Sequence, residues 1–167
     1  NGDTSSRTSP LLSTPMIRQP NTVPRMVPRP PLSTFYVGMN NTSAPFDDER
    51  VRRAIAMGIN RAEIVGSNFP EGYEVANFFT PCVIPNGCVG ESWYPFDPLG
   101  AHNLLDEAGY TGGFQTVLTY RDVARGYLPR PGDVAEAIKE QLRENLGIQV
   151  KLEIMDDELF LQAVDSG

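Results

Sequence analysis

The sequence predicts an α/β fold, with strands and helices that alternate along the chain around one core. The clearest support comes from residues 114–154, where a β-rich run, a helical apolar pattern and a second β-rich run form a βαβ unit. A length of 167 residues suits one domain with its own core and is too short for two ordinary ones. The content of 40% hydrophobic and 21% charged residues is typical of globular domains.

Residues 1–31 differ in composition from the rest of the chain. They contain seven of the 15 prolines, and four arginines against one aspartate give them a charge of +3. Since the whole chain carries −7, residues 32–167 carry −10. Prolines lack a backbone donor and this stretch has few apolar side chains, so we predict an extended, linker-like segment over 1–31 and a folded domain over 32–167. The acidic charge of that domain argues against a nucleic-acid partner.

A strand followed by two helices is expected in the first half of the domain. The strand spans residues 32–39, and one face of it consists of Phe35, Val37 and Met39. Asp47 or Asp48 then caps a helix, and Asn60 caps a second helix with Glu63 three residues later, as in a capping box. The first of these helices has an apolar stripe that consists of Val51, Ala54, Ile55 and Gly58.

Residues 67–96 show no helical or strand periodicity, so a long loop is expected there. The only cysteines of the chain, Cys82 and Cys88, lie in this loop on either side of a Pro-Asn-Gly turn at 85–87. Such a turn favours a local disulfide, and two free thiols are the alternative. A zinc site is not expected, because His102 is the only histidine and a structural zinc needs four ligands.

The helix that follows the loop begins at Asp97 and Pro98 and ends at Gly109. Its apolar stripe consists of Ala101, Leu104, Leu105 and Ala108.

The last third of the chain is the most regular part. A strand over 114–120, a helix over about 133–145 and a strand over 148–154 form the βαβ unit, so the two strands should be parallel. Asp156 or Asp157 then caps a final helix. The residues expected to face inward from that helix are Phe160, Leu161 and Val164.

The sequence offers few candidate catalytic residues. His102 is expected on the solvent side of its helix, and the chain has no nucleophile elbow, phosphate-binding glycine loop, metalloprotease pair or EF-hand motif. The acidic pairs are interpreted as helix caps and solvated surface, except that the last pair also follows a strand end, where α/β folds bind ligands. These pairs are Asp47/Asp48, Asp106/Glu107 and Asp156/Asp157. We therefore predict a protein that is not an enzyme and that needs no cofactor or metal.

Four segments stand out when the chain is taken as a whole. They are STFYVGMN (33–40), FDDERVRRAIAMGINRAEIV (46–65), YPFDPLGAHNLLDEAGY (94–110) and AEAIKEQLRENLGIQVKLEIMD (135–156). In this order and spacing they resemble the family 5 solute-binding proteins of ABC importers, the class of the dipeptide-, oligopeptide- and nickel-binding proteins. The resemblance covers roughly residues 29–167.

The resemblance implies a type II periplasmic-binding-protein fold, in which two α/β lobes close on a solute. This chain is similar to one incomplete lobe, with a mixed sheet, flanking helices and the C-terminal βαβ unit. By the same resemblance, the protein captures a small polar solute or short peptide and delivers it to ABC permease subunits. We expect a monomer outside the cytoplasm, either periplasmic or lipid-anchored to the outer face of the cytoplasmic membrane.

The candidate ligand-binding residues lie near or just after strand ends, because strand carboxyl ends in such lobes approach the crevice between the lobes. They are Tyr36, Asn40, Tyr120, Asp122, Met155 and Asp157. Two alternatives stay open. One is a fold-related sensor or chaperone-like binding protein, and the other is a single-lobe α/β hydrolase with a buried nucleophile near His102.

Overall fold

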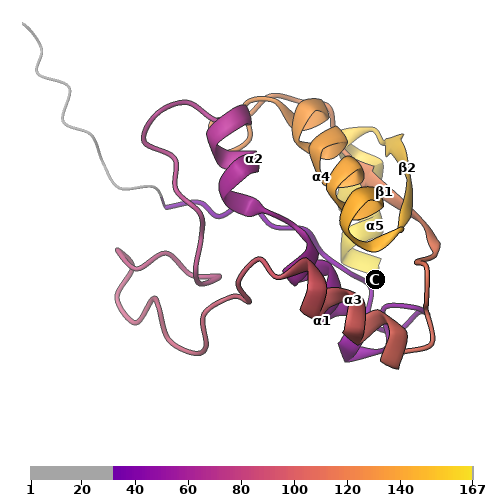
Figure 1. Ribbon diagram of the computed structural model, residues 1–167. Helices are drawn as coiled ribbons and strands as arrows, with labels where there is room; N and C mark the ends of the chain where they lie inside the picture. The colour runs from indigo at the N-terminus through magenta and orange to yellow at the C-terminus, as the bar shows by residue number, and fades with distance from the viewer. Residues whose placement is uncertain (1–31, 167) are drawn as a thin grey trace, which may run out of the picture.

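Five helices and two strands follow one another along residues 32–166, the part of the chain that the computed structural model describes (Figure 1). The elements are α1 (Glu49–Gly58), α2 (Arg61–Asn68), α3 (Pro98–Glu107), β1 (Gln115–Tyr120), α4 (Pro131–Leu146), β2 (Gln149–Ile154) and α5 (Asp157–Ser166). The predicted linker-like segment over 1–31 lies outside the described residues. None of the described helices is long and apolar enough to span a lipid bilayer.

The predicted βαβ unit is confirmed. Strands β1 and β2 pair in parallel, in a register that runs from Gln115 opposite Gln149 to Tyr120 opposite Ile154. Helix α4 connects them and packs against both, and in Figure 1 it lies next to the strand pair. Alternate residues of the strands face this helix, as a period of two requires, and the most buried of them is Val150.

Two glycines fix how the βαβ unit closes. Gly147 ends α4 in the left-handed conformation (φ 68°), with its N–H donated to the Arg143 carbonyl at 3.1 Å. Gly113 precedes β1, also at positive φ, and a Cβ there would collide with the Gly147 carbonyl group. The Gln149 N–H then donates to the Phe114 carbonyl at 2.8 Å, which starts the ladder. Side chains at either glycine would push the strand starts apart.

Three short helices complete the core on the other side of α4. Their N-termini are capped by Asp48, Asn60 and Asp97, which accept hydrogen bonds from the N–H groups of Arg50, Glu63 and Gly100. All four predicted stripe residues of α1 are buried, and so are two of α3, Ala101 and Leu105. Since α4 contacts α1, α2, α3 and both strands, it is the central helix of the core. The buried core consists of Val51, Ala54, Ile55, Ile59, Ile64, Ala101, Leu105, Val134, Ile138, Leu142, Leu146, Ile148 and Val150.

The expected first strand is extended but forms no ladder. Phe35, Val37 and Met39 pack against the core from one face, as predicted. No described strand lies beside residues 32–39, however, and a ladder requires a partner backbone. The sheet among residues 32–166 is therefore a parallel pair, without the antiparallel part of the expected mixed sheet.

Helix α5 also differs from expectation. Leu161 and Val164, predicted to face inward, are 49% and 57% exposed, because no described element covers that face. Phe160 is half-buried beneath the guanidinium of Arg121, 5.0 Å from the ring centroid. Of the two candidate caps, Asp156 accepts from the Glu158 N–H at 3.0 Å, which leaves Asp157 available for other contacts.

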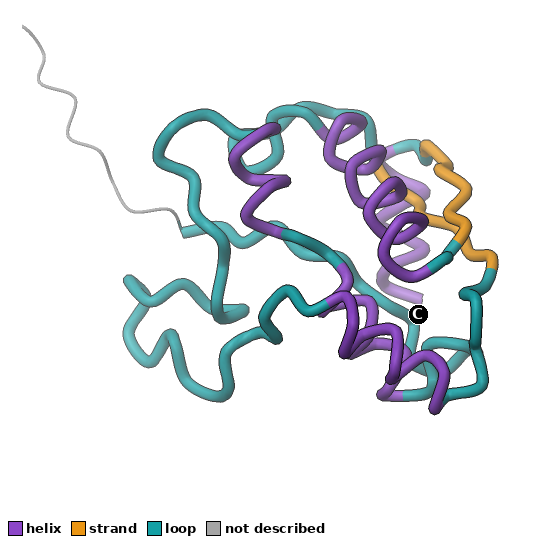
Figure 2. The backbone as a smooth tube through the Cα atoms, in the orientation of Figure 1, coloured by secondary structure: helices purple, strands orange, loops and turns teal. Residues whose placement is uncertain are grey.

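The long loop between α2 and α3 is present as predicted, without a helix or strand (Figure 2). Within it, a disulfide joins Cys82 to Cys88, with their Cα atoms 4.9 Å apart.

The core can be tested with two identical substitutions on α3. Leu105 is 1% exposed and Leu99 is 74% exposed. We expect Leu105→Ala to lower the free energy of unfolding by about 2–5 kcal/mol, because it leaves a cavity in the core. Leu99→Ala should change it by less than about 0.5 kcal/mol. Urea unfolding followed by circular dichroism measures both, and equal effects would contradict the assigned orientation of α3.

Candidate ligand-binding site

The carboxyl ends of β1 and β2 lie at one edge of the sheet, because the strands are parallel. The ladder continues one residue past β2, where the Met155 N–H donates to the Tyr120 carbonyl at 2.9 Å. From this edge the chain passes into the loop 121–130 after β1 and into α5 after β2. The crossover also places the start of α4 here, near the arrowhead of β2 in Figure 1. Three chain segments therefore meet at this edge.

Two arginines and one aspartate form the strongest electrostatic contact at this edge. Nη1 of Arg121 lies 2.6 Å from Oδ1 of Asp157, and Nη2 of Arg125 lies 2.7 Å from the same oxygen. All three side chains are partly exposed, Asp157 at 47%. We call these three residues the arginine cluster. With two guanidinium groups on one carboxylate, its own charge is +1.

The pKa of Asp157 lies below its usual value of 3.8, because Arg125 and then Arg121 donate hydrogen bonds to the carboxylate. The carboxylate is therefore ionised at neutral pH and holds both guanidinium groups in place. At neutral pH the cluster therefore combines two positive charges with one negative charge.

A second polar group lies beside the first turn of α4. A Cβ built on Gly132 would lie 3.5 Å from Oδ1 of Asp122 and 3.7 Å from the Tyr120 hydroxyl. Burial raises the pKa of Tyr120, and the negative charges of Asp122 and Glu136 raise it further. The phenol is thus neutral at physiological pH and can donate a hydrogen bond.

The loop that carries Arg125 is fixed to the end of α2 and the loop beyond it. The Tyr73 hydroxyl donates to the Gly126 carbonyl, and the Tyr73 ring packs against Phe69 with centroids 5.3 Å apart. Arg130 donates to the carbonyls of Ser67 (2.7 Å) and Asn68 (3.1 Å), the last residues of α2. The loop is therefore anchored at Gly126 and Arg130, directly after Arg125.

Four of the six sequence-predicted site residues lie at this edge, namely Tyr120, Asp122, Met155 and Asp157. The other two make their contacts elsewhere. The tilted rings of Tyr36 and Phe79 pack together with centroids 5.1 Å apart, and Oδ1 of Asn40 accepts hydrogen bonds from the backbone and hydroxyl of Thr42. Their proposed contact with a ligand remains a prediction.

Sequence reasoning missed both arginines of the cluster. Arg121 follows β1 directly, so the rule of strand ends that selected Tyr120 and Asp122 also applies to it. Arg125 carries no such signal, because it lies four residues further on in an irregular loop.

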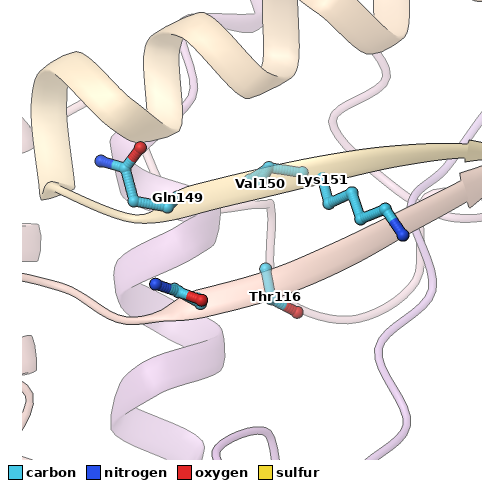
Figure 3. Close-up of a pocket in the computed structure, with 5 residues that line it drawn as sticks. Thr116, Gln149, Val150 and Lys151 are labelled. Atoms are coloured by element: carbon cyan, nitrogen blue, oxygen red, sulfur yellow. The ribbon is translucent and has the colours of Figure 1, made fainter.

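The opposite edge of the sheet has a different character. An open hollow of about 220 Å³ lies at the amino ends of the strands, and Figure 3 shows its lining. The lining residues are Gln115, Thr116, Gln149, Val150 and Lys151. Lys151 pairs with Glu153 at 2.7 Å and is 73% exposed, so this edge has no buried or converging charges. Within residues 32–166, no group of three His, Cys, Asp or Glu side chains is placed to hold a metal ion.

The ion pairs of Asp157 make a testable contribution to stability. A carboxylate whose pKa is lowered by folding stabilises the protein above its unfolded pKa, and this stabilisation is lost as the pH falls through the folded pKa. We therefore expect Asp157→Asn to destabilise the protein slightly at neutral pH, and this effect to shrink below about pH 4 and to vanish as the pH falls through the lowered pKa of Asp157. Urea unfolding from about pH 3 to pH 7 measures it. In an Arg121→Gln/Arg125→Gln background the same substitution should have no effect, and an undiminished effect there would contradict the assignment.

Comparison with known proteins shows which family the chain resembles. The family model for bacterial extracellular solute-binding proteins, family 5 Middle, matches residues 3–167. The glutathione-binding protein GsiB of Escherichia coli (strain K12) is 41% identical over 91 residues, which are 53% of this chain and 17% of GsiB. GsiB of Salmonella choleraesuis is 40% identical over 95 residues, or 56% of this chain and 18% of that protein. The chain thus spans about a sixth of these curated relatives.

Solved structures agree in fold. HbpA2 from Haemophilus parasuis superposes with a TM-score of 0.73 at 28% identity, over 79% of this chain and 26% of that one. The dipeptide-binding protein from Pseudoalteromonas sp. SM9913, in complex with Met-Leu, gives 0.66 at 29% identity, over 76% and 25% of the two chains. DppA from Helicobacter pylori, in complex with the peptide STSA, gives 0.64 at 27%, over 74% and 23%. The family match over nearly the whole chain and the shared fold show that this chain belongs to the family 5 bacterial extracellular solute-binding proteins.

Proposed function

We propose that this chain is part of the binding subunit of an ABC importer, and that the arginine cluster contacts the captured solute. The observation that carries this proposal is the position of Arg121, Arg125 and Asp157 at the carboxyl edge of a parallel strand pair. This edge is where open α/β sheets bind their ligands. On a lobe of a two-lobed protein, the same edge faces the crevice that closes on the solute.

The charges of the cluster suit a solute with both a carboxylate and an ammonium group. A guanidinium group binds a carboxylate through two parallel hydrogen bonds, and the cluster holds two guanidinium groups with an excess charge of +1. Asp157 supplies a carboxylate for a cationic group. A short peptide or peptide-like molecule carries both charges. The relative named for glutathione and the two structures solved with Met-Leu and STSA support this class of solute.

Capture without catalysis is supported by the position of His102. Its side chain is 45% exposed on α3, and Nδ1 lies 4.0 Å from Asp106 one helical turn away. A single-lobe hydrolase requires a buried nucleophile beside this residue, and a surface histidine paired along its own helix does not fit that role. The disulfide and the name of the family both support a location outside the cytoplasm, with permease subunits as partners.

The proposal is tested by calorimetric titration of the intact protein with glutathione and with Met-Leu. If either binds, Arg125→Gln should weaken binding about 10- to 100-fold, because a hydrogen bond between charged groups is lost. The matched control is Arg143→Gln on α4, whose guanidinium pairs with Glu140 and Glu144 of its own helix. Equal affinities of Arg125→Gln and the unsubstituted protein would refute the role of the cluster.

A further inference from the structure

The disulfide loop holds an Asn-Gly pair, Asn86–Gly87, at its tip. Asn86 is exposed and adopts a left-handed backbone conformation with φ 63°. The pair lies inside the ring that the Cys82–Cys88 disulfide closes. Asparagine followed by glycine is the dipeptide whose side-chain amide is most open to attack by the next backbone nitrogen, because glycine has no Cβ to obstruct the approach.

The turn requires glycine after Asn86. A Cβ on Gly87 would collide with the Pro81 carbonyl oxygen and lie 2.9 Å from the Ile84 carbonyl oxygen. Substitution by any other residue would therefore open the turn. The reactive dipeptide is a consequence of the tight turn that brings the two cysteines together.

In this turn the attacking atom, the Gly87 backbone nitrogen, is held by a hydrogen bond. The Gly87 N–H donates to the Ile84 carbonyl at 2.7 Å, and the Ile84 N–H donates to the Pro81 carbonyl at 3.0 Å. The Cys88 N–H donates to the Thr80 carbonyl at 3.4 Å on the other side. For attack, the Gly87 nitrogen must lose its proton and turn toward the Asn86 side chain, and these hydrogen bonds oppose both changes.

We propose that Asn86 is a deamidation site whose reactivity is held in check by the Cys82–Cys88 disulfide. In the reaction, the Gly87 nitrogen bonds to Cγ of Asn86, the bond from Cγ to Nδ2 breaks, and ammonia leaves. Water then opens the cyclic imide to aspartate or isoaspartate. No oxidant or reductant takes part in this step. Reduction of the disulfide speeds deamidation only because it frees the backbone of the turn to move.

The product changes the surface around the loop. A new carboxylate takes the net charge of the chain from −7 to −8. Isoaspartate also adds a methylene group to the backbone inside the cysteine ring, beside the Thr80 hydrogen bond. Thr80 follows Phe79, the ring partner of Tyr36, so this hydrogen bond lies one residue from the exposed aromatic pair.

The test incubates the purified chain at mildly alkaline pH, oxidised or with dithiothreitol, and measures deamidation by peptide mass spectrometry. We expect deamidation at Asn86 to be at least about fivefold faster in the reduced chain, the factor that one intramolecular hydrogen bond represents. A Cys82→Ser/Cys88→Ser variant without reductant should match the reduced chain. The Asn86→Asp variant provides the chromatographic standard for one of the two products.

The chain contains its own matched control, because Asn1–Gly2 is a second Asn-Gly pair outside the cysteine ring. Its rate should not depend on the disulfide. Equal rates at Asn86 in the oxidised and reduced chains would overturn the proposal. So would a reduced chain in which Asn86 stays intact while Asn1 reacts.

Discussion

The packing of α4 against the parallel strand pair is the contact on which the rest of the structure depends. Helix α4 buries Val134, Ile138, Leu142 and Leu146, and it contacts every other helix of the core as well as both strands. Because this helix returns the chain to its starting edge, β1 and β2 run in the same direction and end side by side. Residues that are 36 positions apart in the sequence, Arg121 and Asp157, are thereby brought within hydrogen-bonding distance.

The ion pairs of the arginine cluster contribute little to the stability of the fold. Its members are partly exposed, and exposed ion pairs contribute little because water and salt screen them. A loop held by Tyr73 and Arg130 to α2 and its following loop nevertheless keeps Arg125 in place. Recognition of a charged solute requires side chains of complementary charge that are already held in place. Such a preorganised site loses less conformational entropy on binding.

Local sequence patterns predicted the elements because their causes are local. The Asp97-Pro98 start and the Gly147 end of helices depend on capping chemistry within a few residues, and both occur as expected. The ladder of residues 32–39 and the burial of Leu161 depend on neighbours that no described residue supplies. The position of Asp157 near a strand end predicted its place in the candidate site, whereas nothing in the sequence predicted that of Arg125. Its position depends on how an irregular loop is anchored by distant residues, which periodicity does not encode.

Hydrogen–deuterium exchange of the intact protein, with and without a solute that it binds, tests the central claim most directly. The claim is that the solute is held at the carboxyl edge of the strand pair. We expect binding to slow exchange in residues 121–130 and 155–158, and to leave exchange unchanged at the amino edge around Gln115 and Gln149. Protection at the amino edge, with residues 121–130 and 155–158 unaffected, would contradict the claim.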